Sequence, residues 1–201
     1  MINLPDYGYQ EHSVSFVDSG GVAEGSLGGP SDYIARPGLR FSVHYTLPPL
    51  PSDNEARLFQ SMLERGLRED VSYPFPLDFR PPQASGGQGA VNGSVPAGSS
   101  LPLRNLYPSY PFYVGQPLAV VSSPGIAAGG LGSIHRVTAA AIADGSGLVT
   151  LSVFPWTRTA FVDGNEVEIE RPRIRGILSW DGSTQPAHGK RPFSFTITER
   201  K

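Results

Sequence analysis

Apolar and polar residues alternate along much of this chain, a pattern typical of β-strands that bury one face. The clearest example is residues 149–153, where three apolar residues alternate with two hydroxylated ones. The alternation is weaker over 134–141, and the turn-forming sequence Asp-Gly-Ser-Gly at 144–147 lies between the two segments. Together they predict a β-hairpin, which has to belong to a larger sheet because a two-stranded ribbon alone is marginally stable in water.

The same alternation predicts further strands, eight or nine in all. The more regular ones cover residues 12–17, 39–47, 116–121, 166–170, 174–180 and 192–199, and less regular ones cover 71–79 and 100–106. Within 71–79, Pro74 and Pro76 lack the amide hydrogen that a sheet requires, so this segment is expected at an edge or as an irregular strand. The pattern indicates a mainly β protein.

One segment has helical periodicity instead. Apolar residues at positions 58, 59, 62 and 63 recur at the spacing of one helix face. Ser52 and Glu55 form a capping-box pattern, in which each side chain satisfies a free amide, and Gly66 is a common residue at a helix end. These residues predict one α-helix over about residues 53–65, and no other window has comparable periodicity.

Glycine and proline determine how these elements are connected. The chain has 24 glycines and 20 prolines in 201 residues, yet 39% of its residues are hydrophobic, which is enough to form a core. We therefore expect short strands joined by many turns, within a single domain spanning residues 1–201. Long Gly/Pro-rich loops are predicted over about residues 18–32 and 80–100.

The distribution of charge excludes some partners and favours others. A net charge of −2 and scattered basic residues provide no basic field, so sequence-specific nucleic acid binding is not expected. Arg104 is the only formally charged residue between Pro81 and His135. Prolines and glycines interrupt every apolar run there well before the ~20 residues of a membrane-spanning helix, so no membrane contact is expected. A charge-poor stretch is instead suited to packing against copies of the chain or a partner.

The residues that could support catalysis do not form a recognisable site. The four histidines are not spaced as metal ligands and there is no cysteine, so neither a metal nor another cofactor is predicted. Glu166, Glu168 and Glu170 lie roughly 7 Å apart on one predicted strand face, a spacing compatible with a glycosidase. However, such a run of charge is usually solvated surface, and no apolar pocket is predicted that would raise one pKa. We therefore do not expect an enzyme.

An aromatic cluster provides the candidate interaction residues. Tyr107, Tyr110, Phe112 and Tyr113 lie among prolines in the charge-poor stretch. Rings in such a loop cover the end of a core, pack on a neighbouring subunit, or stack on sugars. We predict that these four residues and Arg104 contact a neighbouring subunit. The alternatives are a carbohydrate-binding site for the rings and simple solvation for Arg104.

Several short patterns follow one another in order through the chain. They are Arg36-Pro37-Gly38, Pro-Pro-Leu-Pro at 48–51, the capped helix, Ala90-Val91-Asn92-Gly93, residues 98–104, Gly115-Gln116-Pro117-Leu118, His135-Arg136-Val137-Thr138, residues 144–147, Val153 to Arg158, Val167-Glu168, Pro172-x-Ile174-x-Gly176, and Ser194-Phe195-x-Ile197-x-Glu199. In this order they resemble the distal tail proteins of siphophages, the long-tailed bacteriophages. The order of the patterns carries the resemblance, which covers most of the chain.

This resemblance implies an antiparallel split β-barrel or β-sandwich with one helix, assembled with copies of itself as a ring, commonly a hexamer. It also implies a structural virion protein of the tail tip, assembled in the host cytoplasm. Such a ring joins the tail tube protein to the baseplate hub, the other tail-tip proteins and the receptor-binding apparatus. The alternative function is a carbohydrate-binding β-sandwich module of a tail adhesin.

Overall fold

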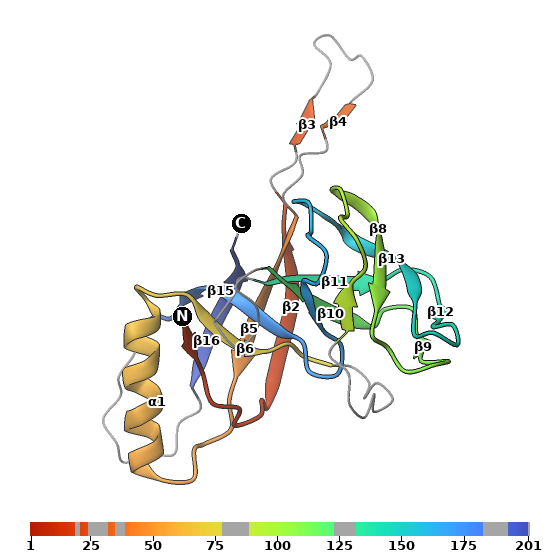
Figure 1. Cartoon of the computed structure of the whole chain (residues 1–201). Coiled ribbons are helices and arrows are strands. Elements are labelled where there is room, and N and C mark those ends of the chain that lie inside the picture. Colours follow the sequence, from red (N-terminus) through yellow and green to blue (C-terminus); the bar gives the residue numbers. More distant parts are fainter. Residues whose placement is uncertain are drawn as a thin grey trace.

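The computed structural model describes residues 1–18, 21–23, 32–34, 39–77, 89–122, 132–182 and 193–200. These residues form one helix and two main β structures, an open six-stranded sheet and a closed six-stranded barrel, which lie side by side (Figure 1). The prediction of a mainly β protein with one helix is confirmed.

The open sheet takes its strands from two distant parts of the chain. In spatial order they are β1 (Ile2–Asn3), β6 (Val71–Pro74), β15 (Arg173–Ser179), β16 (Ser194–Glu199), β5 (Arg40–Thr46) and β2 (Glu11–Val17). Neighbouring strands are antiparallel except β1 and β6, which are parallel. The edges of the sheet are therefore the two-residue β1 and the seven-residue β2.

The helix α1 (Asp53–Gly66) covers one face of this sheet. At its start, Ser52 Oγ accepts a hydrogen bond from the Glu55 amide (3.3 Å) and donates one to the Glu55 carboxylate (3.0 Å). Phe59 and Leu63 are fully buried, and the Phe59 ring lies 5.9 Å from that of Phe195 in β16. The predicted helix is confirmed, and its apolar face is confirmed for Phe59, Met62 and Leu63, whereas Leu58 is 52% exposed.

The barrel is formed by a continuous part of the chain. Its strands follow the spatial order β10 (Pro117–Val121), β11 (Gly132–Val137), β13 (Val149–Thr157), β8 (Gly98–Arg104), β7 (Gly89–Val91) and β14 (Glu166–Glu168), and β14 closes the barrel on β10. All six pairings are antiparallel. Two small strand pairs accompany it: β9 (Pro111–Phe112) with β12 (Ala141–Ile142), and β3 (Gly21–Ala23) with β4 (Asp32–Ile34).

The sheet and the barrel each have a hydrophobic core. Phe41, Val43 and Tyr45 of β5 are fully buried in the sheet core, which also receives Ala119 of β10 and Ile134 of β11. The barrel core is formed by the inward residues of its own strands. The outer face of β10 and β11 therefore packs against the sheet, which fixes the barrel beside it.

The predicted hairpin over residues 134–158 is confirmed in part, because β11 and β13 pair antiparallel with each other. Only two residue pairs join β11 to β13, and the short strand β12 between them pairs with β9 instead. The turn itself is confirmed, because the Asp144 carboxylate accepts hydrogen bonds from the amides of Ser146 (2.8 Å) and Leu148 (2.9 Å). The strands belong to a barrel wall, so their main partners are other strands.

Three further expectations need correction. The described residues form sixteen strands instead of eight or nine, because many are only two or three residues long. The strand β6 is not at an edge, since the short β1 pairs with its free side. The predicted loop over residues 80–100 contains β7 and the start of β8, and that over 18–32 contains β3 and the start of β4. Residues 19–20, 24–31 and 80–88 of these two loops lie outside the described residues.

Candidate interaction surfaces

Two loop segments close one end of the barrel and carry most of the predicted interface residues. Residues 105–116 contain β9, and residues 138–148 contain β12, so the β9–β12 pair joins the two segments. The Leu106 amide also donates a hydrogen bond to the Gly147 carbonyl (3.2 Å). Gly147 has a φ of 74°, and any Cβ there would clash with the Leu106 carbonyl, so this close approach requires glycine.

The four aromatic residues of this end divide into two pairs. Tyr110 and Phe112 are 4% and 1% exposed and belong to the barrel core, where their rings meet edge to face 5.0 Å apart. Burial raises the pKa of the Tyr110 hydroxyl. Tyr107 and Tyr113 are 44% and 48% exposed. Of the predicted interface rings, these two have surface to offer a neighbour, and the other two cover the end of the core.

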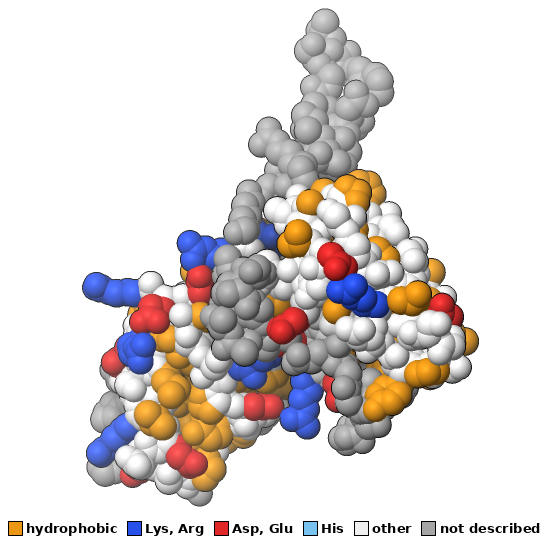
Figure 2. Space-filling model, in the orientation of Figure 1, with side chains coloured by type: hydrophobic (Ala, Val, Ile, Leu, Met, Phe, Trp, Pro, Cys, Tyr) orange, Lys and Arg blue, Asp and Glu red, His pale blue; other side chains and the backbone are white. Residues whose placement is uncertain are grey.

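Exposed apolar side chains extend beyond the two tyrosines. We define the barrel-end surface as Tyr107, Tyr113, Val114, Ile142 and Leu148, of which Ile142 and Val114 are the most exposed. Figure 2 shows hydrophobic side chains gathered on this outer end of the barrel. The only charged residue in the two loop segments is Asp144, whose carboxylate holds the turn described above. Sequence analysis missed the three aliphatic residues, of which only Val114 lies in the charge-poor stretch between Pro81 and His135.

Arg104 lies in β8 and uses its charge within the chain. Its guanidinium binds the Asp163 carboxylate (3.0 Å), and both side chains are exposed. The Asp163 carboxylate also accepts a hydrogen bond from the Gly93 amide (2.7 Å), which, with Arg104, lowers the pKa of Asp163. The pair is accessible, so a neighbouring subunit could contact it, but Arg104 is not an unpaired charge.

The sheet has a different kind of exposed feature. The strand β2 is the last strand of the sheet and pairs with β5 on one side only, and five of its seven residues are exposed. An edge strand presents unpaired amide and carbonyl groups, to which another strand can add. Beyond β2, the β3–β4 pair projects away from both the sheet and the barrel (Figure 1).

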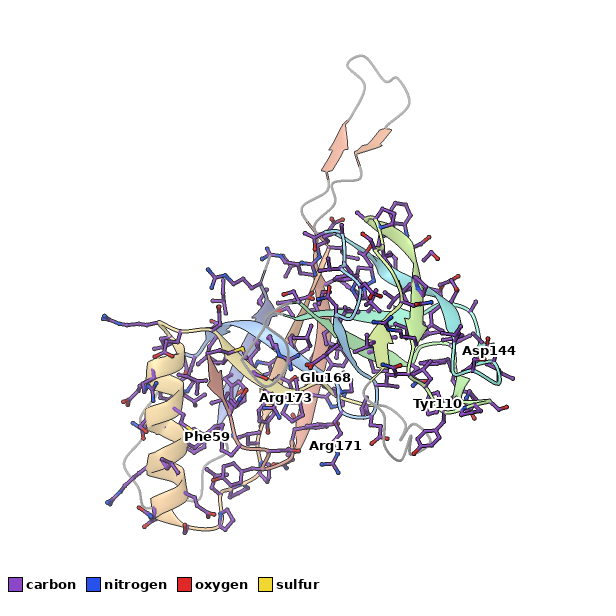
Figure 3. The ribbon with its side chains drawn as sticks, viewed as in Figure 1. Phe59, Tyr110, Asp144, Glu168, Arg171 and Arg173 are labelled. Carbon is purple, nitrogen blue, oxygen red and sulfur yellow. The ribbon has the colours of Figure 1, made fainter. Side chains whose placement is uncertain are left out.

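Of the three glutamates considered for glycoside hydrolysis, Glu168 has both carboxylate oxygens engaged within the chain. Glu168 binds the guanidinium of Arg175 through both oxygens and accepts a hydrogen bond from the Arg173 amide (3.0 Å). Figure 3 shows Glu168 and Arg173 close together where the barrel meets the sheet. Arg175 is 2% exposed, so this is a buried ion pair between the two β structures. The expectation of a solvated or partner-facing acidic strand is wrong for Glu168.

Two of the four histidines, His135 and His44, form contacts with neighbouring strands. His135 is 1% exposed, its Nδ1 lies 2.6 Å from the Pro155 carbonyl oxygen, and burial lowers its pKa to about 4. His44 lies on the exposed face of the sheet, between the hydroxyls of Thr196 and Ser194 at 3.0 Å each. This arrangement lacks the carboxylate that orients a catalytic histidine. Within the described residues, no group of three or more histidine and acidic side chains is placed to hold a metal ion.

Comparison with protein-family models and with curated protein sequences finds no match to this chain. No helix among the described residues has the length and apolar character needed to cross a membrane. The exposed features of the described residues are an apolar end on the barrel, and an open edge with a projecting strand pair on the sheet.

Proposed function

We propose that this chain is a structural protein of a bacteriophage tail tip, which assembles with copies of itself into a ring between the tail tube and the baseplate. A closed ring needs two different contact surfaces on each subunit, one for each neighbour. The observation that carries the proposal is that two such features lie on different β structures: the barrel-end surface, and the β2 edge with the β3–β4 pair beyond it. The order of sequence patterns shared with distal tail proteins supports it independently.

The chemistry of the two features fits a contact between subunits. Exposed Tyr107, Tyr113, Val114, Ile142 and Leu148 lie in segments with a single charged residue, which is the composition of an interface core. The β3–β4 pair is a two-stranded ribbon, which is marginal in water unless something packs against it. A neighbouring copy in a ring would supply that contact. The tail tube and hub proteins would then occupy the two faces of the ring.

The mass of the purified chain in solution tests this proposal. We expect light scattering to give a mass several times 21.5 kDa, alone or after mixing with the tail tube and hub proteins of the same virus, and negative-stain images to contain rings. A chain that stays monomeric at high concentration and also ignores both partners would contradict the proposal.

A matched pair of variants locates the contact. Ile142→Asp places a charge on the barrel-end surface, where the residue is 68% exposed, and is expected to reduce assembly without unfolding the chain. Ile177→Asp makes the same change on the sheet, where the residue is 54% exposed, and is expected to leave assembly intact. Equal effects of both variants would mean that the barrel-end surface is not the contact.

A further inference from the structure

A second exposed apolar group lies where the sheet meets the barrel, away from the barrel-end surface. Phe16 of β2 and Phe154 of β13 have ring centroids 6.2 Å apart, and Trp156 follows on the same outward face of β13. These three residues, which we call the aromatic rim, are 47%, 43% and 65% exposed. Figure 2 shows hydrophobic side chains on the part of the barrel nearest the projecting segment.

The outward position of Phe154 and Trp156 follows from the strand itself. Residues of β13 alternate between the barrel core and the outside, and the pairing of β13 with β8 is interrupted between Ser152 and Thr157. An interrupted ladder bends a strand and redirects its side chains. Two large rings are thereby presented to the outside on a strand whose inward neighbours, Val153 among them, are buried in the barrel core.

Arg136 lies beside this rim. It is the register neighbour of Phe154 in the β11–β13 pair, and its guanidinium lies over the Phe41 ring, 5.7 Å from the centroid. Its side chain is half-buried, and its Nε is enclosed without an acceptor. Within the described part of the chain, no hydrogen bond or ion pair is formed by Arg136. A guanidinium that is partly removed from water gains most from a carboxylate, which it binds with two parallel hydrogen bonds.

The neighbouring charges leave this position positive. Arg158 binds the Glu199 carboxylate, and the Arg40 guanidinium donates a hydrogen bond to the Glu199 main-chain carbonyl (3.4 Å). That carboxylate is fully buried and already accepts hydrogen bonds from the amides of Phe41 (3.2 Å) and Ile134 (2.8 Å). Glu199 therefore neutralises one of the three guanidinium groups, and the charge of Arg136 remains.

We propose that the aromatic rim and Arg136 form a docking site for an acidic segment of a partner protein, with a carboxylate on Arg136 and apolar side chains on the three rings. Tryptophan, phenylalanine and arginine are the residue types enriched in interface hot spots. The positive charge selects an acidic occupant, and the rings select apolar neighbours of that carboxylate. Nucleic acid does not fit, because binding it requires several cations along a backbone. This site does not depend on ring formation.

A peptide tests the site directly. The probe is a blocked ten-residue peptide of alternating glutamate and leucine, and its control carries glutamine in place of every glutamate. In a Trp180→Phe variant, Trp156 is the only remaining tryptophan, because the chain has two. We expect the acidic peptide to cause a saturable blue shift of Trp156 emission that weakens at high salt, and the glutamine peptide to cause none.

Calorimetric titration then assigns the contacts. Arg136→Gln is expected to weaken binding of the acidic peptide about tenfold or more, as for loss of a charged hydrogen-bond pair. Arg68→Gln removes the same charge from an exposed position after α1 and is expected to leave the affinity unchanged. Trp156→Ala, at a position 65% exposed, is expected to fold normally and to weaken binding, so it tests the site even if Arg136→Gln disturbs the fold.

Three results would overturn the proposal: no binding at millimolar peptide, equal binding of the glutamine peptide, or unchanged affinity in both Arg136→Gln and Trp156→Ala. A loss of self-assembly in Arg136→Gln would also overturn it, because the occupant would then be a second copy of this chain. If the chain stays monomeric and ignores the tail tube and hub proteins but binds the acidic peptide through Arg136, the ring proposal fails and the docking site stands.

Discussion

The sheet and the barrel enclose their cores in different ways. The barrel comes from one continuous stretch, residues 89–168, and its closure leaves no strand edge. The sheet is assembled from residues 2–74 and 173–199, is covered on one face by α1, and ends in the open edge of β2. The difference separates two modes of contact: the barrel offers the side chains of its end loops, and the sheet offers a backbone edge.

Two ion pairs join the sheet and the barrel at the junction between them. Glu168 of the barrel reaches Arg175 of the sheet, and Glu199 of the sheet reaches Arg158 and the Ile134 amide of the barrel. Each β structure therefore places one carboxylate among the polar groups of the other. If the barrel unfolded alone, the folded sheet would keep Arg175 without Glu168 and Glu199 without Arg158. If the sheet unfolded alone, the folded barrel would likewise keep Glu168 without Arg175. We infer that the two parts unfold together, although their hydrophobic cores are separate.

The largest expected effect comes from breaking this junction. Glu168→Ala leaves Arg175 buried without its carboxylate, and removing one partner of a buried ion pair costs about 3–5 kcal/mol. We therefore expect the free energy of unfolding, measured with urea, to fall by about this amount. In the unchanged chain, we expect the slowest-exchanging amides of β5 and β13 to exchange hydrogen at one common rate. In Glu168→Ala, we expect two different rates, because the sheet and the barrel would open separately.

The control for this variant is Glu64→Ala on α1. Glu64 is exposed and accepts one hydrogen bond from Gln60 (3.0 Å), so its loss is expected to change the free energy of unfolding by about 0.5 kcal/mol or less. A Glu168→Ala protein as stable as the Glu64→Ala protein would show that the junction contributes little to coupling the two parts.

A smaller effect, confined to acidic pH, is expected from His135 in the barrel. Its pKa is lowered from 6.5 to about 4 by burial, so the folded chain keeps the imidazole neutral while the unfolded chain protonates it. Stability from His135 is therefore present above pH 6.5 and is lost as the pH falls toward 4. The difference of about 2.5 pH units corresponds to about 3 kcal/mol.

Urea unfolding at pH 7.5 and at pH 4.5 measures this loss. His135→Gln is expected to lose less stability between the two pH values than the unchanged chain, whereas His44→Gln, at an exposed position, is expected to lose the same amount as the unchanged chain. Glu199 acts with the opposite sign, because burial raises its pKa and the folded chain then gains stability on acidification. Identical pH dependence with and without His135 would contradict the assignment.

Local patterns were sufficient to predict the helix and most of the longer strands. The capping residues Ser52 and Glu55 and the alternation in β5 act through neighbours in sequence, so the chain itself contains the signal. The partners of these strands could not be predicted in the same way. That β6 is covered by two residues of β1, or that Arg173 and Glu168 meet, depends on contacts between segments brought together by the sheet and the barrel.

The candidate surfaces were predicted less completely, for a similar reason. A charge-poor aromatic stretch pointed to one end of the barrel, but composition cannot tell which rings face inward, so Tyr110 and Phe112 were included with Tyr107 and Tyr113. Ile142 belongs to the same surface only because β12 pairs with β9. Asp163, the partner of Arg104, lies far along the chain and gave no sequence signal of the pair.

The smallest effect is expected from Arg104, the residue that sequence alone would place first at an interface. Its ion pair with Asp163 lies in solvent, where water and salt compete for both groups, so Arg104→Gln is expected to leave the urea midpoint unchanged within measurement scatter. The informative measurement is the assembled mass of this variant beside that of Ile142→Asp. If the contact between copies is made by apolar loops, Ile142→Asp loses assembly and Arg104→Gln retains it. If Arg104→Gln loses assembly at unchanged stability, the charged pair is itself part of the contact, and the barrel then joins its neighbour through the wall of β8 as well as through its end.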